Sequence, residues 1–298
     1  NRPNLGNRPS TLPGNRPGAG NLPNSGNRPN LGSKPNFSNR PNLGDRSNIG
    51  NRPNIGNKPN VNIGNQVNIN RDRNVNSIRN HWNNVENRPF NRNWYGRYPS
   101  TLPGWGWHGG WGRYPGNWYW RHGTWAAYGT WFAWNWNDPI VYNYGTNVVY
   151  RDNYVYVNEQ QVSSSDDYYQ QAATIAESLP EEVPQEEIEW MPLGVFAIAE
   201  EGGVDQGMLI QLAVSKEGFI AGTFYNDATD DGRPLEGQVD KETQRAAWKF
   251  SDGKNPDIVM ETAVYNLTQE EATALVHHGA EKTETWLMVR LPESDEAE

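Results

Sequence analysis

The chain has 298 residues, no cysteine and a formal net charge of −9. Without cysteine it can form neither disulfides nor thiolate metal sites, and no stretch approaches the about 20 apolar residues that a membrane-spanning helix needs. It begins at Asn1 without a charged and apolar leader, so we expect either a processed, exported chain or a trimmed one. These features exclude disulfide scaffolds and membrane-spanning proteins, and they favour a protein held together by packing alone.

Charge is divided unevenly along the chain. Residues 1–93 contain 14 Lys and Arg against Asp45, Asp72 and Glu86, a net charge of +11. Residues 94–298 contain 12 Lys and Arg against 32 Asp and Glu, a net charge of −20. Opposite charges on separate parts of a chain favour contacts between its copies. We therefore expect a basic arm and an acidic globular part that attract each other in neighbouring subunits.

The arm, residues 1–66, is a hexapeptide array. The unit NRPNLG recurs with variation ten times up to Asn62, with Pro at the third position in nine units and, from Leu31 on, an apolar residue at the fifth. A mere spacer does not need a periodic apolar residue, so we expect these positions to carry assembly. The residues concerned are Pro3, Pro29, Pro35, Pro41, Pro53, Pro59, Leu31, Phe37, Leu43, Ile49, Ile55, Val61, Arg28, Arg40 and Arg52.

Two backbone conformations fit a period of six. In an extended polyproline II rod each hexad makes two turns, and sixty residues would reach about 190 Å. The alternative is a left-handed parallel β-helix, which the Leu-Gly spacing resembles. One Pro per hexad cannot donate to a sheet ladder, so we favour the extended rod. Taken alone, an arm of this composition is expected to be disordered and to become ordered on assembly.

The next segment, residues 67–138, is basic at first and then rich in Trp, Tyr and Gly. Exposed aromatic rings stack on sugars, which makes this segment a candidate polysaccharide site. The alternative, which we favour, is that the rings pack in a core or an interface. The candidate glycan contacts are Trp105, Trp107, Trp111, Trp118 and Trp120.

The remaining chain is expected to be mainly β. Residues 139–180 predict a β-hairpin followed by a helix with a Ser N-cap, and residues 181–192 an acidic linker. Residues 193–292 predict a C-terminal α+β domain in which seven strands form a curled or nearly closed antiparallel sheet. Its one helix is expected to begin at Thr268, which forms a capping-box pattern with Glu271, and to end at the C-cap Gly279. Residues 293–298 form an acidic tail.

No catalytic or metal-binding constellation emerges from this domain. His277 and His278 lie at the end of the predicted helix. The stretch NDATDDG from Asn226 is acidic, but the twelfth position counted from Asp227 is Gln238 instead of the Glu that an EF-hand needs. We expect a solvated hairpin loop there, and neither enzymatic activity nor a cofactor.

Residues 139–292 resemble a known family. The segments VYNYGTNVVYRDNYVYVNEQQV, GMLIQLAVSKEGFIAGTFYN and TWLMVRLPE are similar to planctomycete-type cell-surface proteins, sometimes labelled protocadherin-like. The resemblance implies an exported, surface-associated protein, and it supplies no catalytic residues. It does not imply cadherin-type calcium sites.

Together these features predict a structural subunit of an extracellular or cell-surface filament. The chain would polymerise head to tail, the basic arm of one copy meeting the acidic part of the next. Two N-glycosylation triplets, at Asn36 and Asn266, make covalent glycans conceivable. The alternative is a monomeric polysaccharide-binding surface anchor that uses the Trp-rich segment. Nucleic acid is not expected as a partner, because the arm lacks interleaved stacking aromatics.

Overall fold

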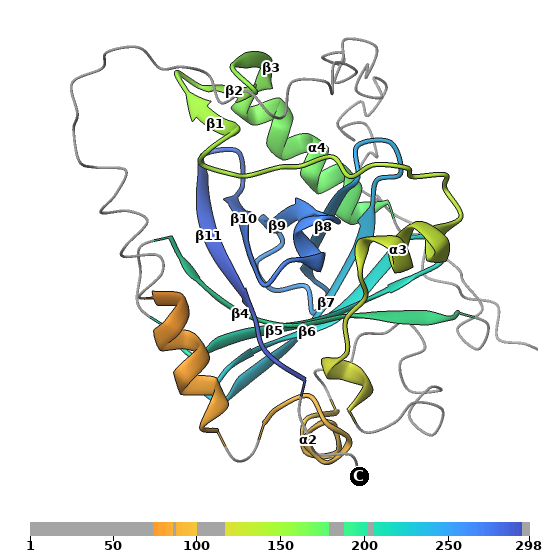
Figure 1. The fold of residues 1–298 in the computed structure, drawn as a ribbon. Coiled ribbons are helices and arrows are strands. Elements are labelled where there is room, and N and C mark those ends of the chain that lie inside the picture. Colours follow the sequence, from red (N-terminus) through yellow and green to blue (C-terminus); the bar gives the residue numbers. More distant parts are fainter. Residues whose placement is uncertain (1–73, 86–87, 100–116, 179–187, 202–204, 294–298) are drawn as a thin grey trace, which may run out of the picture. The chain divides into compact units, whose positions relative to one another are not determined.

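The structure of this protein is a computed structural model that describes residues 74–85, 88–99, 117–178, 188–201 and 205–293 (Figure 1). The predicted arm over residues 1–66 lies outside the described residues, and with it every assembly residue named above. Residues 179–187 of the helix module and linker and residues 294–298 of the tail lie outside them as well.

The described part is mainly β, as predicted, and its centre is an antiparallel barrel of eight strands. The strands are β4 (Trp190–Glu200), β5 (Met208–Ser215), β6 (Phe219–Asn226), β7 (Asp231–Val239), β8 (Arg245–Phe250), β9 (Ile258–Ala263), β10 (Glu271–His278) and β11 (Lys282–Arg290). Strand β4 therefore begins inside the segment predicted as a linker. The expected hairpin loop from Asn226 is confirmed as the β6–β7 turn.

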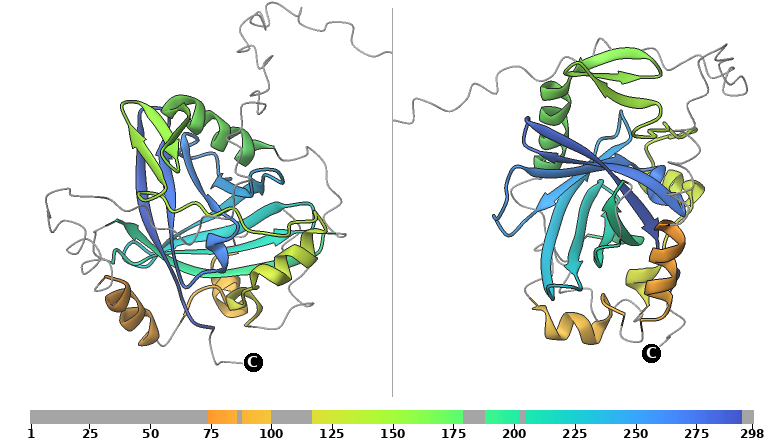
Figure 2. Two further views of the ribbon diagram at one scale, coloured as in Figure 1. Left: turned by 45° about the horizontal axis from the view of Figure 1, so that its top comes forward. Right: turned by 90° about the vertical axis from the view of Figure 1, so that its left-hand side faces the viewer.

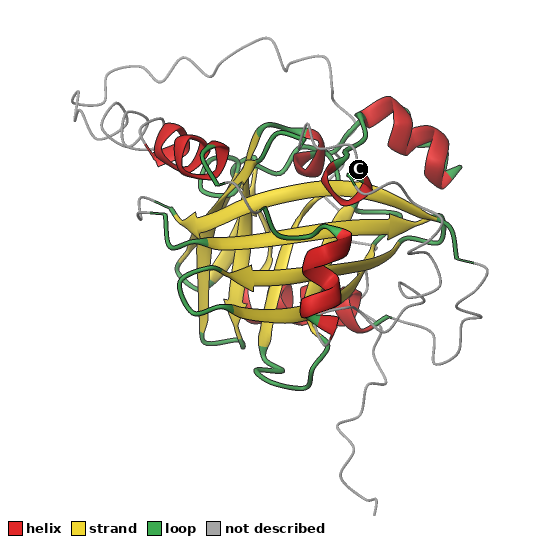
Figure 3. Ribbon diagram, turned by 90° about the horizontal axis from the view of Figure 1, so that it is seen from below, coloured by secondary structure: helices red, strands yellow, loops and turns green. Residues whose placement is uncertain are grey.

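The sheet closes fully, whereas a curled or nearly closed sheet was expected. Each strand pairs with the next along the chain, and β11 returns to pair with β4 from Trp286↔Glu200 to Arg290↔Phe196. Figure 3 shows the strands wrapping round a common interior. Closure leaves the barrel without an unpaired edge strand. Such an edge is the main hazard of an antiparallel sheet, because it can pair with another chain.

The predicted helix from Thr268 is wrong, because this segment supplies the strand that closure requires. Thr268 ends a short 3₁₀ turn, η7 (Asn266–Thr268), and residues 271–278 form β10 between β9 and β11. Ala and Leu favour a helix locally, but pairing on both sides overrides that weak preference. Gly279 has a positive φ of 65°, as the helix-cap prediction required, yet it serves the tight β10–β11 turn.

Both faces of the barrel wall are apolar. Strand β5 is buried at all eight positions: Met208, Ile210, Leu212 and Val214 belong to the interior cluster, and the residues between them face outward. A sheet that is apolar on both faces needs a covering layer on each side. The segments that precede the barrel in sequence provide the outer layer.

One part of this outer layer covers β4, β5, β6 and β11. It consists of a helix over residues 74–83, α2 (Arg92–Arg97) and the 3₁₀ turn η5 (Trp118–Trp120). Trp82, Tyr95 and Trp120 are at most 2% exposed and pack in one cluster with Val195 and Leu209 of the wall. Most of the described tryptophans and tyrosines here are therefore core residues, in line with the packing alternative.

The other part covers β7, β8, β9 and β10. A three-stranded sheet of β1 (Val148–Arg151), β2 (Tyr154–Val157) and β3 (Gln160–Ser164) leads into α4 (Ser165–Glu177), and the two lie together on one side of the barrel (Figure 2). The predicted Ser N-cap is confirmed, since Ser164 Oγ accepts a hydrogen bond from the Asp167 N–H at 3.0 Å. Ala172 and Ala176 of α4 pack against Ala247 and Val259.

Helix α3 (Trp125–Phe132) plugs one end of the barrel, where the β5–β6, β7–β8 and β9–β10 turns lie; we call it the closed end. Tyr128 and Phe132 belong to the interior cluster, and the Phe132 and Trp134 rings stack at 4.4 Å. Trp136 Nε1 donates to the Lys241 carbonyl at 2.9 Å. The aromatic residues between Trp125 and Trp136 thus help to close this end.

A buried ion pair fastens α4 to the barrel. Arg245 on β8 donates through Nε to Glu261 Oε2 on β9 at 2.9 Å, and their side chains are 3% and 0% exposed. The guanidinium also donates to Gln171 Oε1 at 3.1 Å and lies 4.0 Å from the centre of the Tyr168 ring. A charge this deeply buried is tolerable only while it remains paired.

Breaking this pair from one side is expected to destabilise the whole fold. Glu261→Gln leaves the Arg245 charge buried and unpaired, so urea titration should show a loss of about 3–5 kcal/mol in unfolding free energy. The control is Glu177→Gln, which removes an exposed 3.0 Å pair with Lys249 and should cost about 0–1 kcal/mol. Equal losses in the two variants would contradict the assigned role.

The same pair predicts a pH dependence. Burial alone would raise the pKa of Glu261, but Arg245 and His277 beside it hold that pKa below its ordinary value of 4.5. The contribution of Glu261 to stability is therefore complete above about pH 4.5 and is lost as the pH falls through the folded-state pKa. Glu261→Gln should accordingly flatten the acid limb of the stability profile, which Glu177→Gln should leave unchanged.

Candidate functional site

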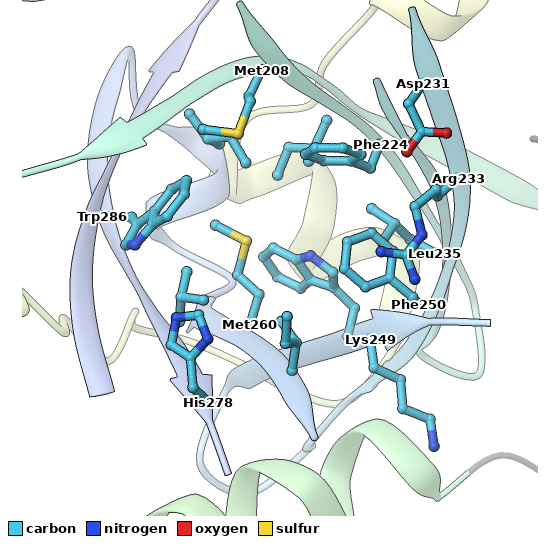
Figure 4. Close-up of a pocket in the computed structure, with 15 residues that line it drawn as sticks. Met208, Phe224, Asp231, Arg233, Leu235, Lys249, Phe250, Met260, His278 and Trp286 are labelled. Carbon is cyan, nitrogen blue, oxygen red and sulfur yellow. The ribbon is translucent and has the colours of Figure 1, made fainter. Parts of the chain in front are cut away.

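The barrel contains an apolar pocket at the end opposite α3, which we call the open end. Its volume is about 230 Å³, and all eight strands contribute to its lining (Figure 4). The lining residues are Ile198, Met208, Ile210, Phe224, Asp231, Arg233, Leu235, Trp248, Lys249, Phe250, Ile258, Met260, Val276, His278 and Trp286. Asp231 is exposed, so the pocket opens to solvent at this end.

Arg290 helps to keep the other end of the interior sealed. This β11 side chain is 2% exposed and lies over the Phe196 ring at 4.6 Å. It donates to the backbone carbonyls of Leu193 at 3.0 Å, Gln269 at 3.2 Å and Leu267. These bonds tie the start of β4 to the β9–β10 connection. Near α3 the interior is thus filled by Tyr128 and Phe132, whereas the pocket lies toward the open end.

Gly237 on β7 lets two strands of the pocket wall pack closely. It pairs with Trp248 on β8, and a Cβ atom at position 237 would lie 2.6 Å from the Trp248 Cα. Real Cβ atoms do not approach backbone this closely, so only glycine permits the pairing. The glycine therefore helps to place the Trp248 ring in the lining.

The walls consist mainly of aromatic rings and methionines. The Phe224 and Phe250 rings meet edge to face at 5.6 Å, and Met208 and Met260 lie across the pocket between aromatic neighbours (Figure 4). Thioether sulfur packs well against aromatic rings and adapts to irregular shapes. Such a lining suits planar or branched apolar groups of varied outline.

Arg233 forms part of the wall and is not a free cation. Its guanidinium lies 3.4 Å from the centre of the Phe250 ring and makes two 2.8 Å bonds to the Asp252 carboxylate. It also donates to Asn255 Oδ1 at 3.1 Å and to the Lys254 carbonyl at 2.8 Å. With its nitrogens engaged in this way, Arg233 holds the β8–β9 turn against the pocket.

The polar groups on the opposite side of the mouth are also paired with one another. Glu284 accepts from His278 Nε2 at 2.9 Å and from Lys282 Nζ at 2.5 Å. The hydrogen bond from Lys282 is the main reason that the pKa of Glu284 lies below its usual range. Trp286 Nε1 points to the same carboxylate at 3.5 Å. This cluster fixes the Trp286 ring at the edge of the pocket.

The four turns at the open end are mainly acidic, and we call their described residues the acidic rim. These turns span residues 200–207, 226–233, 250–258 and 278–284. The rim carries Glu200, Glu201, Asp205, Asp227, Asp230, Asp231, Asp252, Asp257, Glu281 and Glu284 against Arg233, Lys254 and Lys282, a net charge of −7 with His neutral. The mouth of an apolar pocket is therefore surrounded by negative charge.

The predicted site residues do not form this pocket. Trp105, Trp107, Trp111 and Asn36 lie outside the described residues. Trp118 and Trp120 are 6% and 2% exposed, so stacking against the barrel leaves no face for a sugar, and their prediction as glycan contacts is wrong.

Asn266 is not an available glycosylation site either. It is 3% exposed, and its Nδ2 donates to the Tyr142 carbonyl at 2.8 Å and to Thr262 Oγ1 at 2.9 Å. A glycan on this nitrogen would require the β9–β10 connection to unfold. The triplet that begins at Asn266 is a structural element of the closed end.

Sequence reasoning missed the pocket. Met208 and Ile210 lay in a segment predicted as a strand, but Val276 and His278 lay in a segment predicted as a helix. A pocket lined by eight strands could not be recognised, because only seven strands were predicted and full closure of the sheet was not.

The chain matches no protein-family model, no curated protein and no solved structure. Within the described ranges, no cluster of three or more His, Cys, Asp or Glu could hold a metal ion. No helix in those ranges is long and apolar enough to cross a membrane. The function is therefore inferred from the pocket and its rim.

Removing the Arg233 side chain should release Asp252. The hydrogen bond from Arg233 is the main cause that lowers the pKa of Asp252 from 3.8, so Arg233→Met should raise this pKa toward 3.8. Carboxyl-carbon NMR titration measures the change. Lys254→Met, which keeps the two Arg233 bonds, is the control and should shift the pKa less. If both variants leave the pKa where it is, Arg233 does not anchor the turn as described.

Proposed function

We propose that the barrel is a binding module that takes a small apolar group through its open end. The observation that carries this proposal is the apolar pocket of about 230 Å³, lined from all eight strands and open to solvent beside Asp231. An apolar cavity of about 150 Å³ stays dry and binds benzene, so this pocket suits a group of one or two rings or a short branched chain. Burial of such a group gains about 25 cal/mol for each Å² removed from water.

The chemistry of the lining supports binding over catalysis. Arg233 and Glu284 are engaged by neighbouring side chains. The groups that face the interior are chiefly aromatic, aliphatic and thioether. The net charge of −7 around the mouth favours neutral or cationic molecules over anionic ones.

Filament assembly at the cell surface remains a second proposal for the chain as a whole. Its support is the charge division, +11 over residues 1–93 and −20 over residues 94–298, together with the resemblance to surface proteins. In this proposal the arm of one copy contacts the acidic part of another, and glycans are optional additions.

Binding of a neutral apolar dye tests the pocket. N-phenyl-1-naphthylamine should bind the full chain saturably with one site and increased fluorescence. Val276 is 7% exposed and faces the pocket, so Val276→Trp should fill the space and weaken binding at least about tenfold, or about 1.4 kcal/mol.

The matched control adds the same ring elsewhere. Tyr154 on β2 is 41% exposed and lies away from the pocket lining, so Tyr154→Trp should leave dye binding unchanged. Dye affinity that is equal in Val276→Trp and in the unmodified chain would place the binding site elsewhere and overturn the proposal.

A further inference from the structure

We infer that the occupant of the pocket is the repeat arm of a second copy of this chain. In this inference, which rests on the proposed binding function of the barrel, a fifth-position aliphatic side chain enters the pocket. The Arg or Lys at the second position of the same hexad then meets the acidic rim. The same contact would join successive copies into a chain.

The first argument is that the open end is where the described part can bury an apolar group. Of the large hydrophobic residues in that part, only Val141 and Tyr154 remain exposed, at 38% and 41%. The two residues do not line the pocket. An arm with regularly spaced aliphatic residues therefore finds its apolar partner surface at the barrel mouth.

The second argument is the match of charge. Four rim carboxylates, those of Glu201, Asp231, Asp257 and Glu281, have no ion-pair partner within the described residues. The hexads NRPNIG and NKPNVN, residues 51–62, each carry one cation and no acid. Such complementarity speeds association and fixes orientation more than it adds affinity.

The third argument is reach. In an extended chain at about 3.1 Å per residue, the second and fifth positions of a hexad are about 9 Å apart. An eight-stranded barrel with strands about 4.8 Å apart and tilted by about 40° has a radius of about 8 Å. An aliphatic residue on the barrel axis thus places the Arg or Lys of its hexad over the rim.

The fourth argument identifies the occupant as another copy. The arm offers ten similar units, whereas the described part of each chain presents a single barrel mouth. One pocket can hold one unit at a time, so the remaining units of an arm are available to the pockets of other copies. Burial of one Ile or Leu is worth only about 1.5–3 kcal/mol, so repeated units would strengthen a weak single contact by rebinding.

Two variants of the full chain, used separately and together, test this inference by sedimentation velocity. The first is the pocket-filled Val276→Trp chain. The second, the arm variant, carries Asn at four fifth positions: Leu43→Asn, Ile49→Asn, Ile55→Asn and Val61→Asn. The unmodified chain should self-associate as its concentration rises, and each variant alone should associate at least about tenfold more weakly. The Tyr154→Trp control should associate normally.

Mixing the two variants is the decisive step, because one retains an intact arm and the other an intact pocket. They should form complexes with each other at concentrations at which each variant alone stays dissociated, and salt should weaken these complexes as it screens the rim. Mixtures that stay dissociated, or self-association that Val276→Trp leaves unchanged, would overturn the inference.

Two further measurements keep a misfolded variant from deciding the result. Asp257→Asn with Glu281→Gln removes rim charge at exposed positions outside the pocket lining, and it should weaken self-association without changing dye binding. If the dye binds the unmodified chain but that chain does not self-associate, the inference about the arm fails while the binding function stands. If the dye does not bind the unmodified chain, both the proposed binding function and the inference about the arm fail.

Discussion

The structure depends on covering a barrel wall that is apolar on its outer as well as its inner face. Val195 and Leu209 face outward, yet both are fully buried. Without the segments that precede the barrel, this outer face would be exposed to water at a cost of about 25 cal/mol per Å². The many aromatic side chains among the described residues between 74 and 136 are therefore needed to cover the barrel when the chain folds.

The covering layers also determine where the barrel is open. Helix α3 and Arg290 seal the closed end, and the sheet of β1–β3 with α4 is fastened to the wall by Arg245 and Glu261. The acidic turns at the other end leave the interior accessible. An apolar pocket with a charged mouth follows from this arrangement.

The sequence predicted most strands of the barrel because short apolar runs are separated by turn residues, and it predicted α4 because Ser164 and the acidic first turn are strong local signals. It failed where long-range pairing decides. β10 has helix-forming residues and becomes a strand only between β9 and β11, and closure depends on that strand. The roles of Trp118 and Trp120 were equally hidden, because composition does not tell which surface an aromatic ring covers. To predict the pocket, one would have needed both the assignment of β10 as a strand and the closure of the sheet.

Amide hydrogen exchange on the full chain tests most directly whether the barrel and its covering layers are one cooperative unit. The account predicts that the helix over residues 74–83, α2 and α3 exchange as slowly as β4–β6 and become unprotected together with them in rising urea. Fast exchange in those helices beside a protected barrel would contradict it, because the outer face of the wall would then be stable without its cover.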